Sequence, residues 1–300
     1  MASGNEIPVL KPEISPGFHF ETIEWQQPLF AEAHHELFHI NRLEDFRDKI
    51  KFPLPPHRKT VYDFIFLTKG ESKRSKGLNE YTFGEDTFFF LPANQITTHQ
   101  SMSEDARGFF CHFDVQIFRL GGLQMPLENF SFLQFLANPL LKIPKAVQKP
   151  ILNILERLKE LYQEDQKGDF GLIATYLLAL LIEVKKFVPT EKKLPKNSAV
   201  LVTQQYKNAL MQYIYQKQHV LDYADLLNVT PNHLNKCVKT TTGKTAQDLL
   251  NEMLILEAKS LLKYSNLQIA EIAVKLCNQT PSNFARFFKS QTGISPKEYQ

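Results

Sequence analysis

The stretch that decides the fold of the C-terminal third is Thr230-Pro231-Asn232-His233-Leu234-Asn235-Lys236-Cys237-Val238-Lys239. Fifty residues later the chain repeats it as Thr280-Pro281-Ser282-Asn283-Phe284-Ala285-Arg286-Phe287-Phe288-Lys289. Each copy starts with Thr-Pro, has a basic residue at its seventh position and Lys at its tenth, and is followed by Thr-Gly. Threonine is a good N-cap, proline fits the first helical position, and glycine commonly ends a helix. The repeat therefore predicts two short helices with fixed starts and polar, basic faces.

The surroundings of each repeat also read as helical. A short helix is predicted before each copy, at residues 220–228 and at residues 267–276. Thr245-Ala-Gln-Asp248 resembles a capping box and opens a longer helix to about Tyr264. We therefore predict two helix-turn-helix units joined by one connecting helix.

A helix-turn-helix places its second helix in the major groove, where asparagine pairs with adenine and Arg or Lys with guanine. The late lysines of each helix are better placed for phosphate. Residues 200–300 hold 11 Lys and Arg against 7 Asp and Glu, whereas the rest holds 24 against 25. The excess positive charge thus lies with the repeat. The expected DNA-binding residues are Thr230, Asn232, His233, Asn235, Lys236, Lys239, Thr280, Ser282, Asn283, Arg286 and Lys289.

The N-terminal half has a different pattern of short aromatic and β-branched segments separated by turn residues. Several short strands at this spacing favour an antiparallel barrel or sandwich. The predicted strands are 18–20, 38–40, 62–67, 87–91 and 109–115, with turns at 53–56, 69–72, 92–94 and 107–108.

Two helices are expected after Pro144. Ile151, Leu155, Leu158 and Tyr162 recur at helical spacing, and Asp169 can cap a second helix to about residue 187. The second helix is apolar around most of its surface, so either the barrel or a second subunit must cover it. Residues 189–198 are polar, contain two prolines and read as a linker.

Residues 221–299 resemble the DNA-binding domain of the AraC family of bacterial transcription regulators. The resemblance rests on residues 222–230, 242–245, 257–262, 269–273, 286–289 and 292–299. It implies two reading helices in successive major-groove segments, with direct-repeat half-sites for a dimer. The family usually has Gly-Phe where this chain has Cys277-Asn278, and an aromatic residue at Asn283. We therefore expect the first unit to set most of the base preference.

Residues 55–115 resemble the cupin-type barrel of such regulators, through Pro56-His57, Lys69-Gly70, Leu91-Pro92, His99 and the segment 108–113. The resemblance implies a domain that senses a small molecule and dimerises. An organic ligand held by aromatic and a few polar groups would suit this barrel. The candidates, each equally explicable as core, are His57, Tyr62, Phe64, Phe66, Phe89 and His99.

Two patterns in the N-terminal half would indicate a metal site instead. His35-Glu36-Leu37-Phe38-His39 matches the HExxH zinc-peptidase pattern, but residues 38–43 alternate like a strand. A cupin metal site needs paired histidines and a glutamate, and His57 is followed by Arg58 and Lys59. We expect no metal, no cofactor and no catalytic step.

The remaining composition narrows the class. Cys111, Cys237 and Cys277 form no CxxC pair, which argues against a disulfide framework. The apolar run 170–182 is too short to span a bilayer, and no secretory signal is recognisable, so we expect a cytoplasmic protein without a membrane partner.

The sequence thus predicts an α+β, multi-domain regulator. Residues 1–188 form a cupin-like antiparallel barrel (about 18–120) with helical dimerisation segments (about 145–188), 189–198 the linker, and 199–300 the all-α DNA-binding domain. Expected partners are double-stranded DNA, a second copy of the chain and a small-molecule effector, and contact with RNA polymerase is compatible with such a regulator. A constitutive DNA-binding protein whose barrel only dimerises is the main alternative. Neither effector, operator nor sign of regulation follows from the sequence.

Overall fold

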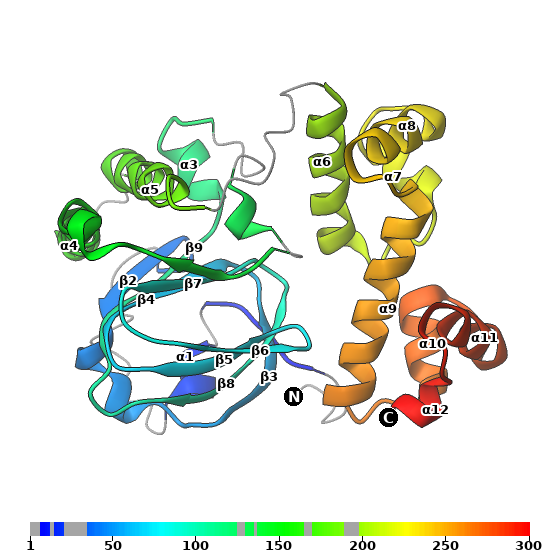
Figure 1. Ribbon diagram of the computed structural model, residues 1–300, viewed down its shortest axis with the longest axis horizontal. Coiled ribbons are helices and arrows are strands. Elements are labelled where there is room, and N and C mark those ends of the chain that lie inside the picture. Colours follow the sequence, from blue (N-terminus) through cyan, green and yellow to red (C-terminus); the bar gives the residue numbers. More distant parts are fainter. Residues whose placement is uncertain are drawn as a thin grey trace. The chain divides into compact units, whose positions relative to one another are not determined.

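The computed structural model describes residues 7–12, 15–20, 35–124, 130–134, 137–164, 170–188 and 198–300. The chain divides into two compact units, residues 9–189 and residues 190–300 together with 1–8 (Figure 1). Of the expected linker, 189–197 lie outside the described residues, as does the expected cap Asp169.

Two five-stranded sheets form the N-terminal unit, with strand orders β1-β3-β8-β5-β6 and β10-β7-β4-β9-β2. Neighbouring strands pair antiparallel except β1 with β3. The predicted antiparallel barrel class is confirmed. The strands are β1 (Val9–Leu10), β2 (Phe38–Arg42), β3 (Leu54–Lys59), β4 (Tyr62–Lys69), β5 (Ser72–Lys76), β6 (Asn79–Phe83), β7 (Thr87–Leu91), β8 (Ile96–Met102), β9 (Arg107–Phe113) and β10 (Leu140–Lys142).

Some predicted strand positions were wrong. Phe18 and His19 belong to helix α1 (Ser15–His19), because Ser15-Pro16 is a helix start, and only Phe20 makes a bridge, to Ile50. The proline-rich segment predicted as a turn is part of β3, with its prolines at the irregularity between Leu54 and His57. Gly108, also predicted as a turn, lies in β9 with φ 140°, where an added Cβ would lie 1.9 Å from the Phe66 carbonyl oxygen.

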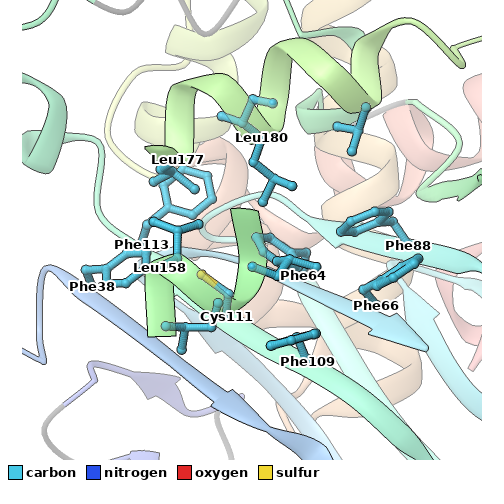
Figure 2. Packing of buried hydrophobic residues seen from close by; sticks show 14 of the residues in the cluster. Phe38, Phe64, Phe66, Phe88, Phe109, Cys111, Phe113, Leu158, Leu177 and Leu180 are labelled. Atoms are coloured by element: carbon cyan, nitrogen blue, oxygen red, sulfur yellow. The ribbon is translucent and has the colours of Figure 1, made fainter. Parts of the chain in front are cut away.

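The core of the N-terminal unit has two faces because side chains alternate along β4. Phe64 and Phe66 point to the side covered by helices α4 (Gln148–Glu164) and α5 (Phe170–Lys185). Figure 2 shows Leu177 and Leu180 packed over this layer, in which Phe66 stacks on Phe88 at 4.2 Å. The alternate residues of β4 and β7, among them Ile65 and Phe89, form a separate cluster between the sheets.

Helix α5 is covered on one side by the barrel domain. Gly121, which follows α3 (Gln116–Leu120), approaches α5 so closely that an added Cβ would lie 2.6 Å from Ala174 Cβ. The opposite side of α5 keeps Leu172 and Ile182 54% and 49% exposed. The barrel therefore accounts for only part of the apolar surface noticed in the sequence.

The C-terminal unit is helical. The capping box predicted at Thr245 and Asp248 is confirmed and opens the connecting helix α9, which has eleven buried residues. Its helices are α6 (Ser198–Tyr213), α7 (Val220–Leu226), α8 (Pro231–Thr242), α9 (Ala246–Tyr264), α10 (Ile269–Cys277), α11 (Pro281–Thr292) and α12 (Pro296–Tyr299).

Candidate nucleic-acid interface and barrel cavity

The two repeated segments form α8 and α11, and both helices start and end in the same way. The Thr230 hydroxyl accepts a hydrogen bond from the His233 amide at 3.2 Å, and Thr280 accepts one from the Asn283 amide at 3.3 Å. Gly243 and Gly293 end the helices in the left-handed conformation. The caps leave the remaining amides of each first turn available to an anion such as phosphate.

The turns before α8 and α11 also share one geometry. Asn228 has φ 53° and Asn278 has φ 45°, so both turns use asparagine in the left-handed conformation that glycine occupies most readily. Cys277 is buried at 8% exposure. Asn278 thus supplies the left-handed residue of the second turn, as Asn228 does in the first.

Most of the predicted DNA-binding side chains lie on the exposed faces of α8 and α11. Leu234, Val238, Phe284 and Phe288 are buried on the opposite faces. Arg286 donates to the Asn283 side chain at 2.6 Å, which links two of the predicted readers. The exposed set is Asn232, His233, Lys236, Lys239, Ser282, Asn283, Arg286 and Lys289.

Asn235 differs from its expected position. Its side chain is half-buried, and its Oδ1 accepts a hydrogen bond from the Ala246 amide at 3.0 Å. This amide is the first of α9 and has no partner within the helix. Asn235 therefore fastens the start of α9 to α8.

The N-terminal unit has a partly open cavity of ≈ 60 Å³ between its two sheets. Of the predicted ligand candidates, His57 and His99 line it, whereas Tyr62, Phe64, Phe66 and Phe89 do not. Tyr62, Phe64 and Phe66 pack in or against the helix-covered cluster, and Phe89 packs against Phe83 between the sheets. The cavity is lined by Pro12, His19, Phe20, His39, Asn41, Leu43, Phe46, Ile50, Leu54, His57, Lys59, Val61, Ile65, Arg74, His99, Met102, Phe110 and His112.

A buried ion network lies at the polar side of this cavity. Arg74 donates to both Asp63 oxygens at 2.9 and 3.0 Å, and Lys59 lies 3.0 Å from Asp63 Oδ2. Burial would raise the pKa of Asp63, but the Arg74 and Lys59 charges hold it well below its usual range. Burial lowers the pKa of Lys59.

Burial keeps four of the cavity histidines neutral. Burial, together with the Lys59 charge, lowers the pKa of His57 to about 3, and burial lowers that of His112 to about 4. Burial also lowers the pKa values of His39 and His99. The Lys and Arg side chains on the described part of the cavity wall are Lys59 and Arg74.

Four further residues of the cavity wall were not predicted from the sequence: Lys59, Arg74, His39 and His112. The only available sign was the occurrence of charged residues within otherwise apolar or aromatic strands, as at Asp63 in β4. Its partner Arg74 comes from another strand, which local periodicity does not reveal.

The HExxH pattern does not lie on a helix. Residues 35–37 form a turn and 38–42 form β2, so His35 and His39 lack the one-face arrangement that the zinc motif needs. His39 instead contacts the Tyr162 hydroxyl at 2.9 Å and Asn41 at 3.0 Å. Across the described residues, no group of three or more His, Cys, Asp or Glu is arranged to hold a metal.

No described helix is both long enough and apolar enough to cross a bilayer.

Comparison with known proteins identifies the C-terminal repeat. A family model described as a helix-turn-helix domain matches residues 223–300. The HTH-type transcriptional regulator YisR of Bacillus subtilis is 24% identical over 256 residues, covering 80% of this chain and 86% of YisR. The HTH-type transcriptional activator AarP of Providencia stuartii is 32% identical over 79 residues, or 26% of this chain and 58% of AarP.

Among solved structures, ToxT from Vibrio cholerae aligns over 87% of this chain and 96% of its own, with 16% identity and a TM-score of 0.39. The family match covers α8 to α12 and most of α7, and the relatives found by sequence are named as transcription regulators. The C-terminal domain, with its two capped helix-turn-helix units, is a DNA-binding domain of the AraC type, and the chain is similar to transcription regulators.

Proposed function

We propose that the chain reads specific DNA sequences with the exposed faces of α8 and α11. One observation carries this proposal: two helices fifty residues apart share the same cap, the same left-handed exit and exposed cations at matching positions. These pairs are Lys236 with Arg286, and Lys239 with Lys289. A single polar surface helix would not carry the proposal.

The connecting helix α9 sets a suitable distance between the two units. Its 19 residues rise by ~28 Å, while successive major-groove segments on one face of DNA lie about 34 Å apart. Both flanking units pack on α9, which Figure 1 shows running between them. One monomer can thus present α8 and α11 to neighbouring groove segments.

Within each helix the two cations would contact different parts of the DNA. Lys236 and Arg286 occupy the middle of the exposed face and would read base edges, whereas Lys239 and Lys289, one turn later, would contact phosphate. Asn232 and His233 add readers in the first unit, Ser282 and Asn283 in the second. Thr230 and Thr280 act by fixing the helix starts. Asn235 is not proposed to read bases, because its Oδ1 accepts a hydrogen bond from the Ala246 amide of α9.

We also propose a homodimer formed through α5. Leu172, Thr175, Ala179 and Ile182 follow a heptad-like spacing along its uncovered side, and Leu172 and Ile182 are the exposed apolar residues in this stripe. A dimer would present two DNA-binding domains, and the direct-repeat half-sites expected of this family would follow. We also propose that the DNA-bound regulator contacts RNA polymerase. The proposed function includes no catalytic step.

The barrel cavity supports control by a small molecule. Residues of both sheets line it, and its wall is mainly apolar with a few polar groups, as in ligand sites of proteins. We propose that occupancy changes the DNA affinity of the C-terminal domain. A protein whose barrel only dimerises would instead keep the same affinity with any metabolite present.

Selection of bound sequences from a random DNA pool by the full-length protein tests the DNA-binding proposal. The expected result is one enriched motif with two recognition elements about one helical turn apart, repeated if the protein is a dimer. Recovery of unrelated sequences at every salt concentration would contradict sequence-specific reading.

A further inference from the structure

The chemistry of the cavity wall restricts the ligand it can hold. The wall contains Lys59 and Arg74 but no Asp or Glu among its described residues. Asp63 lies behind the wall and is fully buried. Its single carboxylate pairs with both cations, Lys59 and Arg74. Among the described residues, two cations thus face one carboxylate, and an anion would offset the excess positive charge in this low-dielectric setting.

His57 supplies the second, independent observation. It is 1% exposed, and its Nδ1 contacts the Pro55 carbonyl oxygen at 2.8 Å. Since a carbonyl oxygen can only accept, Nδ1 carries the proton and Nε2 presents a lone pair. Within the described residues this Nε2 is buried without a hydrogen-bond partner. A buried acceptor normally has one, so a ligand that donates to Nε2 would complete the site.

The two groups lie on one strand at a fixed spacing. His57 and Lys59 are two residues apart on β3, so both side chains face the cavity and their Cα atoms are ~6.6 Å apart. Arg58, between them, points elsewhere and donates to the Asn94 carbonyl at 2.7 Å. A ligand that meets both groups needs its anionic group and its donor within a few bonds of each other.

The volume of the cavity sets the size of the ligand. One water needs about 10–15 Å³ measured in this way, so ≈ 60 Å³ accommodates only a few heavy atoms. Apolar groups from Leu43, Ile65 and Met102 would contact a short carbon skeleton.

We propose that the barrel binds a small hydroxycarboxylate, with its carboxylate at Lys59 and Arg74 and its hydroxyl donating to His57 Nε2. This inference rests on the proposed ligand control and names the chemical class of the ligand.

The test uses calorimetric titration of the full-length protein with four probes. Lactate and 3-hydroxybutyrate carry both groups, propanoate lacks the hydroxyl, and lactamide lacks the charge. Lactate or 3-hydroxybutyrate should bind at least about 30-fold more tightly than lactamide, the range expected for a buried charge interaction, and about 10-fold more tightly than propanoate.

Variants assign these preferences to residues. Lys59→Met leaves Asp63 paired with Arg74 and should remove the preference for the acid over the amide, whereas Lys59→Arg should keep it. His57→Phe should remove the preference for lactate over propanoate, and His57→Gln, which retains an acceptor, should keep part of it. Lys73→Met is the matched control, because Lys73 is 44% exposed and paired with Glu80 on the surface.

The outcomes separate this proposal from ligand control. Equal binding of lactamide, an unchanged acid preference in Lys59→Met, or no binding of either hydroxy acid would overturn the assignment. Acid binding without a change in DNA affinity would instead refute ligand control and leave the acid site standing. If another compound alters DNA affinity while the hydroxy acids do not bind, ligand control stands and the acid site fails.

Discussion

Asn228 and Asn278 adopt the same left-handed backbone conformation at equivalent positions of two turns fifty residues apart. Each lies two residues before the threonine that caps the following reading helix. In the second turn the left-handed residue is thus Asn278, one position after Cys277, where the AraC family usually has glycine, and asparagine tolerates this conformation well.

The left-handed turn gives the first prediction. Asn278→Ala should destabilise the C-terminal domain by about 1 kcal/mol, because alanine pays a steric penalty at positive φ, while Asn278→Gly should be neutral or stabilising. Urea unfolding followed by helical circular dichroism measures both. Equal stability of the alanine and glycine variants would show that the turn relaxes to another conformation.

The second prediction concerns base reading. Arg286→Ala and Lys236→Ala should each weaken specific DNA binding by about 1–3 kcal/mol and relax preference at defined base pairs. Titration of specific and random DNA at fixed salt separates the two effects. Lys149→Ala, an exposed lysine of α4, serves as the control and should change neither. If both DNAs lose affinity equally in the test variants, these residues do not read bases.

Lys289 should behave differently. Lys289→Ala is expected to weaken binding to all sequences similarly and to reduce the slope of log affinity against log salt by about 1, because it removes one phosphate contact. Binding measured at four or more salt concentrations gives this slope. A selective loss at one base position would reassign Lys289 to base reading.

A further prediction concerns the buried carboxylate. Asp63→Asn leaves Lys59 and Arg74 buried without their counter-charge and should destabilise the N-terminal domain by about 3–5 kcal/mol. Asp105→Asn, whose partner Lys69 is on the surface, is the control and should leave the stability nearly unchanged. Thermal unfolding of the two variants makes the comparison.

The same carboxylate predicts the direction of pH dependence. Because the pKa of Asp63 is depressed in the folded state, its stabilising contribution is present above the unfolded value of about 4 and is lost as pH falls below it. Wild-type protein should thus lose stability below about pH 4 more steeply than Asp63→Asn. Parallel stability curves for the two proteins would contradict the depressed pKa.

The exposed stripe of α5 gives the last prediction. Leu172→Glu combined with Ile182→Glu should yield monomers without lowering the folding stability, since both side chains are already exposed. Sedimentation velocity reports the assembly, with Val147→Glu as a control on another exposed apolar residue. An unchanged dimer in the double variant would place the interface elsewhere.

The C-terminal domain was largely predictable because its information is local. Thr230, Thr280 and Thr245 mark helix starts within one turn of the residues that they cap. The barrel was less predictable. The aromatic strands were recognised, but β5, β6 and β8 are rich in polar residues and lack the expected alternation of apolar side chains.

The site residues likewise include some that local sequence patterns predict and others that depend on tertiary contacts. The exposed faces of α8 and α11 follow from helical periodicity, whereas the engagement of Asn235 with the Ala246 amide depends on how α8 meets α9. The charged cavity wall depends on pairing between Asp63 of β4 and Arg74 of β5, strands that belong to different sheets. Such contacts are fixed by tertiary structure and have no local pattern.

The continuous connecting helix constrains how the protein can evolve. Each residue inserted into α9 would move the second unit by about 1.5 Å and also turn it by about 100° about the helix axis. A small change in length would therefore rotate α11 away from the face that α8 presents. New operator spacings are consequently easier to reach by changing the arrangement of two chains than by lengthening α9 within one.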